Sequence, residues 1–281
     1  MPERLTDECS ALAFYGVGVT PRSVGAFLEA VRDWFGRCGF PPTHMGVGGR
    51  GFSGKMVRVG AAASRLERQG LDSVSDVTVV SALPDAEVIS HDYALSASLS
   101  SRLGLLGVVA RTGIADLRSE PYRELAQRLV SIAAPAYGIG YRRSHALSPD
   151  LYAAGIGFGL DGGDADYIEM LNISFWTDAK RDRLWESGIL RDVYEWNFLS
   201  ETQLSAPVDG LPLRSWIEAD RGRGRFVPLD GPLTLWEVEA GDLAPVRRRL
   251  WDAGIIFNWP RHVEGAEAHP YASRAALRYS A

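Results

Sequence analysis

The sequence is poor in cysteine, in lysine and in long apolar runs. Its two cysteines, Cys9 and Cys38, are too few for a disulfide framework, so we expect both thiols to be reduced. Only Lys55 and Lys180 among the 30 basic residues are lysine. Apolar stretches fall short of the roughly 20 residues that a membrane span needs. The first residues are acidic where a secretory signal would be basic and then apolar, and a cytoplasmic protein is therefore expected.

Composition and charge place the chain among ordinary globular proteins. It has 281 residues, of which 46% are hydrophobic and 23% charged, which is enough for one large domain or two smaller ones. The formal net charge of −5 argues against broad binding to the phosphate backbone of nucleic acid, because such binding needs a concentrated basic face. A basic protein partner suits this charge better.

Periodicity along the chain predicts helices and strands in both halves. Thr20 and Pro21 begin a helical stripe that Gly39 ends, and a second helix is expected over 56–69. Alternation from Ile89 to Leu99 predicts a half-exposed antiparallel strand.

This mixture predicts an α+β fold of two sheet-and-helix units with mostly antiparallel or mixed sheets. The expected division is an N-terminal unit over 1–150 and a C-terminal unit over 151–281, with one continuous domain as the alternative. Similar strand-then-helix layouts at 12–39 and 233–254 suggest a pseudo-duplication.

A glycine-rich segment is the one candidate for a cofactor site. Gly49, Gly51, Gly54 and Lys55 fit a dinucleotide pattern and the first positions of a phosphate-binding loop. In the latter, the next residue supplies a hydroxyl to magnesium, and here it is Met56. We therefore expect a loop between elements and no cofactor, with a nucleotide-using enzyme as the alternative.

Catalytic and metal-binding patterns are not recognisable. The five histidines do not pair at metal-ligand spacing with each other or with cysteine, and no metal site is expected. The chain has no Gly-x-Ser-x-Gly nucleophile elbow, although a triad assembled from distant residues stays possible. An enzyme is therefore the less favoured class.

Aromatic residues interleaved with charges mark a stretch that fits neither helical nor strand period. Seven of the eight tryptophans lie after residue 175. Large aromatics dominate protein interfaces when they are exposed, and the alternative is a loop held against the core by its aromatics. The candidate partner-binding residues are Arg191, Tyr194, Trp196, Asn197 and Trp216.

The same stretch resembles bacterial proteins of the type VI secretion and polymorphic-toxin immunity class. The resemblance covers about 135–257 and is carried by the following segments: Arg191-Asp-Val-Tyr-x-Trp-Asn-Phe-Leu199, Leu213-x-x-Trp216-Ile217, Trp236-x-Val238, Tyr137–Arg142 and Tyr152–Gly155.

The resemblance implies a cytoplasmic, non-enzymatic immunity protein that neutralises a cognate bacterial toxin by direct binding. The mild acidity of the chain suits this role, because toxins that act on nucleic acid tend to have basic clefts. The expected partner is a protein, with neither nucleic acid nor membrane involved. A phage-related or structural assembly protein is a further alternative, and the oligomeric state stays open.

Overall fold

The computed structural model describes residues 7–84, 86–89, 92–157 and 164–279. The chain divides into two compact units. The first unit consists of 1–135, 142–150 and 230–232, and the second of 136–141, 151–229 and 233–281. Each unit is described by itself below.

The first unit is built on six strands that pair antiparallel in the order β1-β6-β5-β4-β2-β3. The central strands of this sheet are rich in small and β-branched residues, and most of their side chains are buried while the rest are half-buried. The strands are β1 (Glu8–Tyr15), β2 (His44–Gly49), β3 (Phe52–Arg58), β4 (Val74–Ala82), β5 (Tyr93–Ser100) and β6 (Leu105–Arg111).

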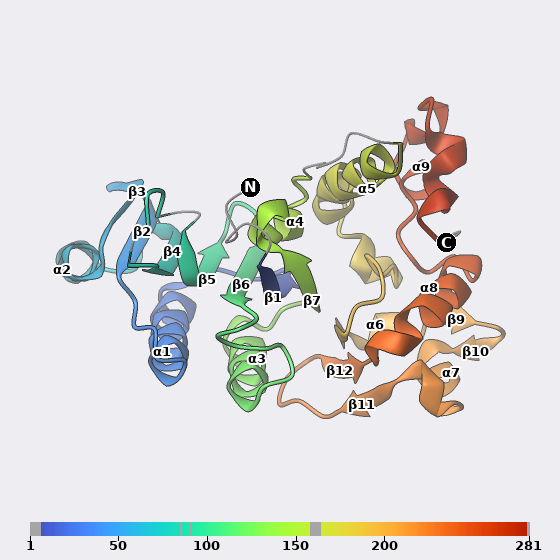
Figure 1. Ribbon diagram of the computed structural model, residues 1–281, viewed down its shortest axis with the longest axis horizontal. Coiled ribbons are helices and arrows are strands. Elements are labelled where there is room, and N and C mark those ends of the chain that lie inside the picture. The colour runs from blue at the N-terminus through green and yellow to red at the C-terminus, as the bar shows by residue number, and fades with distance from the viewer. Residues whose placement is uncertain (1–6, 85, 90–91, 158–163, 280–281) are drawn as a thin grey trace. The chain divides into compact units, whose positions relative to one another are not determined.

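Three helices accompany this sheet: α1 (Pro21–Arg37), α2 (Val59–Gln69) and α3 (Glu120–Ala133). At the start of α1 the Thr20 hydroxyl accepts a hydrogen bond from the Ser23 amide, which satisfies one of the free donors of the first turn. Figure 1 shows α1 and α3 side by side. Trp34 of α1 and Tyr122 of α3 pack edge to face, with their ring centres 5.3 Å apart. Aromatic side chains therefore contribute to the core of this unit together with its many buried Ala, Val and Leu residues.

The second unit has shorter strands, in the order β11-β12-β8-β7. They are β7 (Tyr137–Ser144), β8 (Trp196–Leu199), β11 (Arg225–Val227) and β12 (Thr234–Glu237), and a separate hairpin joins β9 (Pro207–Val208) to β10 (Leu211–Pro212). The last three residues of β7 belong to the first unit. Asp209 and Gly210 both take positive φ angles in the hairpin turn, the geometry that an Asp-Gly pair favours.

Helices of 4 to 18 residues complete the second unit. They are α4 (Pro149–Ala154), whose last four residues lie in this unit, α5 (Asp164–Arg181), α6 (Glu201–Leu204), α7 (Leu213–Glu218), α8 (Leu243–Asp252) and α9 (Trp259–His262). Short 3₁₀ turns in the two units span His145–Leu147, Leu184–Ser187, Arg221–Arg223, Ala240–Asp242 and Ala266–Ala268, and a longer 3₁₀ helix spans Ala272–Tyr279. The fully buried tryptophans of this unit are Trp176, Trp196, Trp236 and Trp259.

The α+β class is confirmed, and so is the helix that begins after Thr20. The helix expected over 56–69 is wrong at its start, because Met56 lies in β3 and α2 begins only at Val59. The strand expected from Ile89 begins at Tyr93, and residues 90–91 lie outside the described residues. The pseudo-duplication is not shown, and the domain boundary near residue 150 stays a prediction.

None of the helices in the described ranges combines the length and the apolar character needed to cross a membrane.

Candidate functional site

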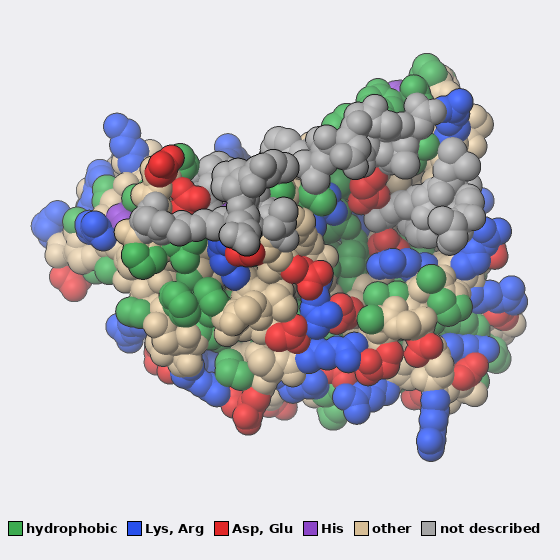
Figure 2. All heavy atoms as spheres, in the orientation of Figure 1, with side chains coloured by type: hydrophobic (Ala, Val, Ile, Leu, Met, Phe, Trp, Pro, Cys, Tyr) green, Lys and Arg blue, Asp and Glu red, His purple; other side chains and the backbone are tan. Residues whose placement is uncertain are grey.

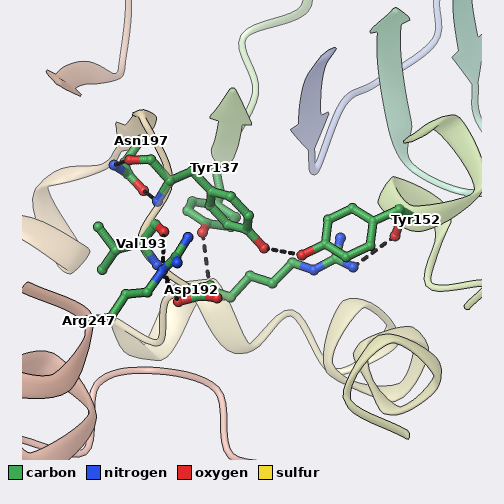
Figure 3. Close-up of polar contacts among 8 residues, drawn as sticks. Tyr137, Tyr152, Asp192, Val193, Asn197 and Arg247 are labelled. Atoms are coloured by element: carbon green, nitrogen blue, oxygen red, sulfur yellow. Dashed lines mark hydrogen bonds and ion pairs between the residues drawn. The ribbon is translucent and has the colours of Figure 1, made fainter. Parts of the chain in front are cut away.

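The aromatic and charged stretch lies in the second unit, where it leads into β8 with almost no regular backbone pairing. Asn197 replaces that pairing: its Oδ1 accepts from the Tyr194 amide at 2.9 Å, and its Nδ2 donates to the Tyr194 carbonyl at 2.7 Å. Figure 3 shows these paired bonds between Asn197 and the backbone. Because buried amides and carbonyls need partners, the Asn197 side chain fixes the local path of the chain.

A second side chain reaches the same stretch from α8. The Arg247 Nε donates to the Val193 carbonyl at 2.8 Å and lies 3.3 Å from Asp192 Oδ1, which also accepts from the Val193 amide at 2.7 Å (Figure 3). Asp192 is only 3% exposed, and a buried carboxylate needs compensation. Arg247 supplies the opposite charge, and the Val193 amide supplies a hydrogen bond. This arrangement ties the loop to α8.

Arg191 is a buried cation, 3% exposed, at the carboxyl end of α4. Its Nη2 donates to the Tyr152 carbonyl at 2.8 Å, and its Nη1 lies 3.5 Å from the Ala153 carbonyl. The guanidinium also lies 3.9 Å from the centre of the Tyr152 ring and 5.3 Å from that of Trp176. The free carbonyls of a helix end carry partial negative charge, and Arg191 therefore stabilises α4.

Lys180 approaches the same helix end from α5. Its Nζ donates to the Ala154 carbonyl at 2.5 Å. Burial, with the positive charge of Arg191 as the second cause, lowers the pKa of Lys180 to about 8. The two cations together satisfy three successive carbonyls at the end of α4.

Tyrosines surround these cations. The hydroxyls of Tyr152 and Tyr194 share a hydrogen bond of 2.6 Å, and the Tyr141 ring lies 5.1 Å and 5.8 Å from their ring centres. The Tyr137 hydroxyl accepts from the Arg191 amide at 3.1 Å. We call this set the tyrosine-arginine cluster: Tyr137, Tyr141, Tyr152, Arg191 and Tyr194.

Four of the five residues predicted from sequence to bind a partner meet at this cluster or beside it. All five are buried, with exposed fractions of 3% for Arg191, 5% for Tyr194, 1% for Trp196, 0% for Asn197 and 3% for Trp216. Trp216 lies apart on α7, where its Nε1 donates to Asp209 at 3.1 Å and the Arg223 guanidinium covers its ring at 4.2 Å. A role in partner binding stays a prediction, and it would act through the surface that these side chains support.

Sequence reasoning found Arg191 and Tyr194 but did not predict Lys180, Arg247 or the other three tyrosines, Tyr137, Tyr141 and Tyr152, as site residues. A signal for Lys180 was present, since it is one of only two lysines in a chain that otherwise uses arginine. Nothing in the local pattern marks Arg247, because its role depends on how α8 packs against a segment 54 residues away in the chain.

The glycine-rich segment lies in the first unit and forms a β-hairpin. Gly49 pairs with Phe52, and Arg50 and Gly51 make the turn. The register shifts at Gly48 and Gly49, and a Cβ on Gly49 would lie 2.0 Å from the Ser73 carbonyl oxygen. These glycines therefore serve β-bulges and a tight turn, and the strand–loop–helix geometry of a nucleotide loop is not formed there.

A groove that the sequence did not predict lies between α1 and α2 of the first unit. Its volume is about 460 Å³, and apolar side chains including Leu28, Met45 and Leu66 line most of it. Glu29 and Glu67 lie among the lining residues. Its volume lies within the range of pockets that bind small molecules. Among the described residues, no three His, Cys, Asp or Glu side chains gather in a way that could hold a metal ion.

Comparison with known proteins places the fold beside a secretion-system protein. No family model matches the chain, and no curated protein matches it. A solved structure, the Pseudomonas aeruginosa T6SS protein PA0821, is similar with a TM-score of 0.54 at 11% sequence identity. The match covers 89% of this chain and 74% of the other. The chain therefore shares its fold with a type VI secretion protein.

Proposed function

We propose that this protein is a type VI secretion immunity protein, which neutralises a cognate bacterial toxin by binding it directly. The observation that carries the proposal is the likeness of fold to a T6SS protein over 89% of the chain. The stretch that resembles immunity proteins in sequence, about 135–257, falls largely in the second unit.

The distribution of charge supports a basic partner for the second unit. The first unit has 16 Lys and Arg against 16 Asp and Glu and is neutral, whereas the second has 14 against 19 and a formal charge of −5. The whole net charge of the protein therefore falls on one unit. Opposite charge accelerates encounter, so a basic toxin would meet the second unit first.

The first experiment identifies the toxin by purifying the tagged protein from its native cell and analysing what accompanies it by mass spectrometry. We expect one stoichiometric protein, whose toxicity in a bacterial host is suppressed when the two are produced together. The proposal fails if no stoichiometric protein is recovered, or if the recovered protein is equally toxic with and without its companion.

Charge-reversal variants then test the surface. Glu264 and Glu267 are exposed carboxylates of the second unit without an ion-pair partner among the described residues. The variant Glu264→Lys/Glu267→Lys should slow association with the toxin several-fold and weaken its salt dependence. The matched control Glu29→Lys/Glu67→Lys makes the same change of charge in the first unit, and we expect it to associate at the wild-type rate.

A further inference from the structure

Strand β3 is the outermost strand of the first unit's sheet. It pairs with β2 on one side, and no strand within the described ranges pairs with its other side. An unpaired strand edge presents backbone donors and acceptors that another extended chain can use.

The register shows which backbone groups of β3 face outward. The Val59 amide donates to the Thr43 carbonyl at 3.0 Å, so these two residues face each other as a hydrogen-bonded pair. Two positions further along the ladder, Val57 faces Met45. Because hydrogen-bonded and non-hydrogen-bonded pairs alternate in an antiparallel ladder, the amides and carbonyls of Met56 and Arg58 point away from β2. The outer edge therefore offers the amide and carbonyl of Met56 and the amide of Arg58, because Arg58 is the N-cap of α2 and its carbonyl accepts the first hydrogen bond of that helix.

The edge is exposed and positively charged. Lys55, Val57 and Arg58 are exposed, with Val57 at 42%. Five basic residues and one acidic residue lie between 50 and 68, and Figure 2 shows Lys and Arg side chains gathered over the region of β3 and α2. Within this segment, the side chains of Arg50, Lys55, Arg58 and Arg68 make no ion pair or hydrogen bond with a described residue, whereas Arg65 donates to the Gly51 carbonyl.

The positive charge of the β3 edge also determines which kind of strand can pair with it. If two copies of the protein paired through β3, Lys55 and Arg58 of each copy would lie against the same cations of the other, and like charges across two strands are destabilising. Lysine on an edge strand is known to prevent such self-pairing. A strand that carries carboxylates would instead compensate the four unpaired cations.

We propose that the outer edge of β3 binds an extended acidic segment of another protein as an added strand. Backbone hydrogen bonds to Met56 and Arg58 supply the register, and carboxylates of the segment meet Lys55, Arg58 and their neighbours. This surface lies in the neutral first unit and on residues that the proposed toxin contact does not use. If the strand-addition proposal fails, the toxin-binding proposal is therefore unaffected.

A labelled peptide that alternates Glu and Val is the probe, and a Lys-Val peptide of the same length is its counterpart. We expect fluorescence anisotropy to show binding of the acidic peptide to the full-length protein about tenfold or more tighter than binding of the basic one. Amide NMR signals of Met56 and Arg58 should shift on addition of the acidic peptide. Equal binding of the two peptides, or shifts elsewhere only, overturns the proposal.

Two variants separate strand addition from charge attraction. Met56→Pro removes an outward amide while the ladder to β2 keeps its bonds, and we expect it to weaken binding about tenfold or more. Lys55→Glu/Arg58→Glu leaves the backbone unchanged and should weaken binding at least as much. The matched control Arg22→Glu/Arg102→Glu reverses two exposed cations elsewhere in the unit and should bind as the wild type does.

Two further results contradict the proposal. Full binding by Met56→Pro shows that the peptide does not add a strand. Binding of a single-stranded oligonucleotide that Lys55→Glu/Arg58→Glu abolishes, with no binding of the acidic peptide, assigns the basic edge to nucleic acid instead.

Discussion

The two units satisfy their backbones by different means. In the first unit, six strands pair along ladders of up to seven residue pairs, and the backbone groups of these strands largely serve one another. In the second unit the strands of the sheet beside β8 pair over three or four residues, and Asn197, Arg191 and Arg247 take over where pairing stops. In the second unit, individual side chains therefore satisfy backbone groups that strand pairing satisfies in the first unit.

The cores of the two units also differ in their tryptophan content. The first unit contains one tryptophan, Trp34, and the second contains the other seven. Tryptophan fluorescence will therefore report mainly on the second unit. The following predictions test this contrast between a ladder-built unit and a unit built on side chains.

The largest effect is expected at Trp196, which is 1% exposed. Trp196→Ala should lower the free energy of unfolding by about 3–5 kcal/mol, because it removes a large buried ring and leaves a cavity. Denaturant titration followed by tryptophan fluorescence measures the loss, with Trp196→Phe as a control that should lose less. Wild-type stability in the alanine variant would show that the ring does not support the core.

Removing the buried cation should have the next largest effect. Arg191→Met keeps an unbranched side chain but leaves the Tyr152 and Ala153 carbonyls without this donor, which should cost about 2–3 kcal/mol in unfolding free energy. Arg181→Met removes an exposed arginine from surface ion pairs and should cost below about 1 kcal/mol. If the two losses are equal, Arg191 does not hold the end of α4.

In the first unit, Cys9 should make the protein less stable at alkaline pH. Its side chain is 0% exposed, and burial raises the pKa of its thiol from 9.0 to about 12. The unfolded state loses this proton first, so stability falls as pH rises from 9 towards 12, by about 2 kcal/mol at pH 10.5. Unfolding free energies of wild type and Cys9→Ala, compared across this range, should converge or cross as pH rises. Parallel curves would contradict the prediction.

In the second unit, Lys180 should make the protein more stable as pH rises, over part of the pH range in which Cys9 makes it less stable. Its pKa is lowered from 10.5 to about 8, so the unfolded state binds the proton more tightly and stability rises between pH 8 and 10.5. Lys180 is partly exposed, and screening by solvent reduces the expected gain to about 1–2 kcal/mol. Lys180→Met should lack this gain. A variant whose pH dependence matches that of the wild type would show that Lys180 does not titrate in this range.

Much of the fold could be predicted where local signals agree. Thr20, Pro21 and the apolar stripe of α1 are neighbours in the chain, and the helix they predict is present. The segment 56–58 was misassigned because its residues also suit the helix that follows, and only pairing with β2 extends β3 to Arg58. Propensity is a weak prior that tertiary pairing overrides.

The amino-acid sequence by itself determined the α+β class, the enrichment of tryptophan in the second half and the unusual composition of 191–199. Tertiary structure alone decided that Arg191, Tyr194, Trp196 and Asn197 lie inside the protein, and that the Gly49 to Lys55 segment is a hairpin at a sheet edge. The physical reason is that burial and charge compensation depend on partners distant in the chain. Tyr152 lies 42 residues before Tyr194, and Arg247 lies 54 residues after Val193.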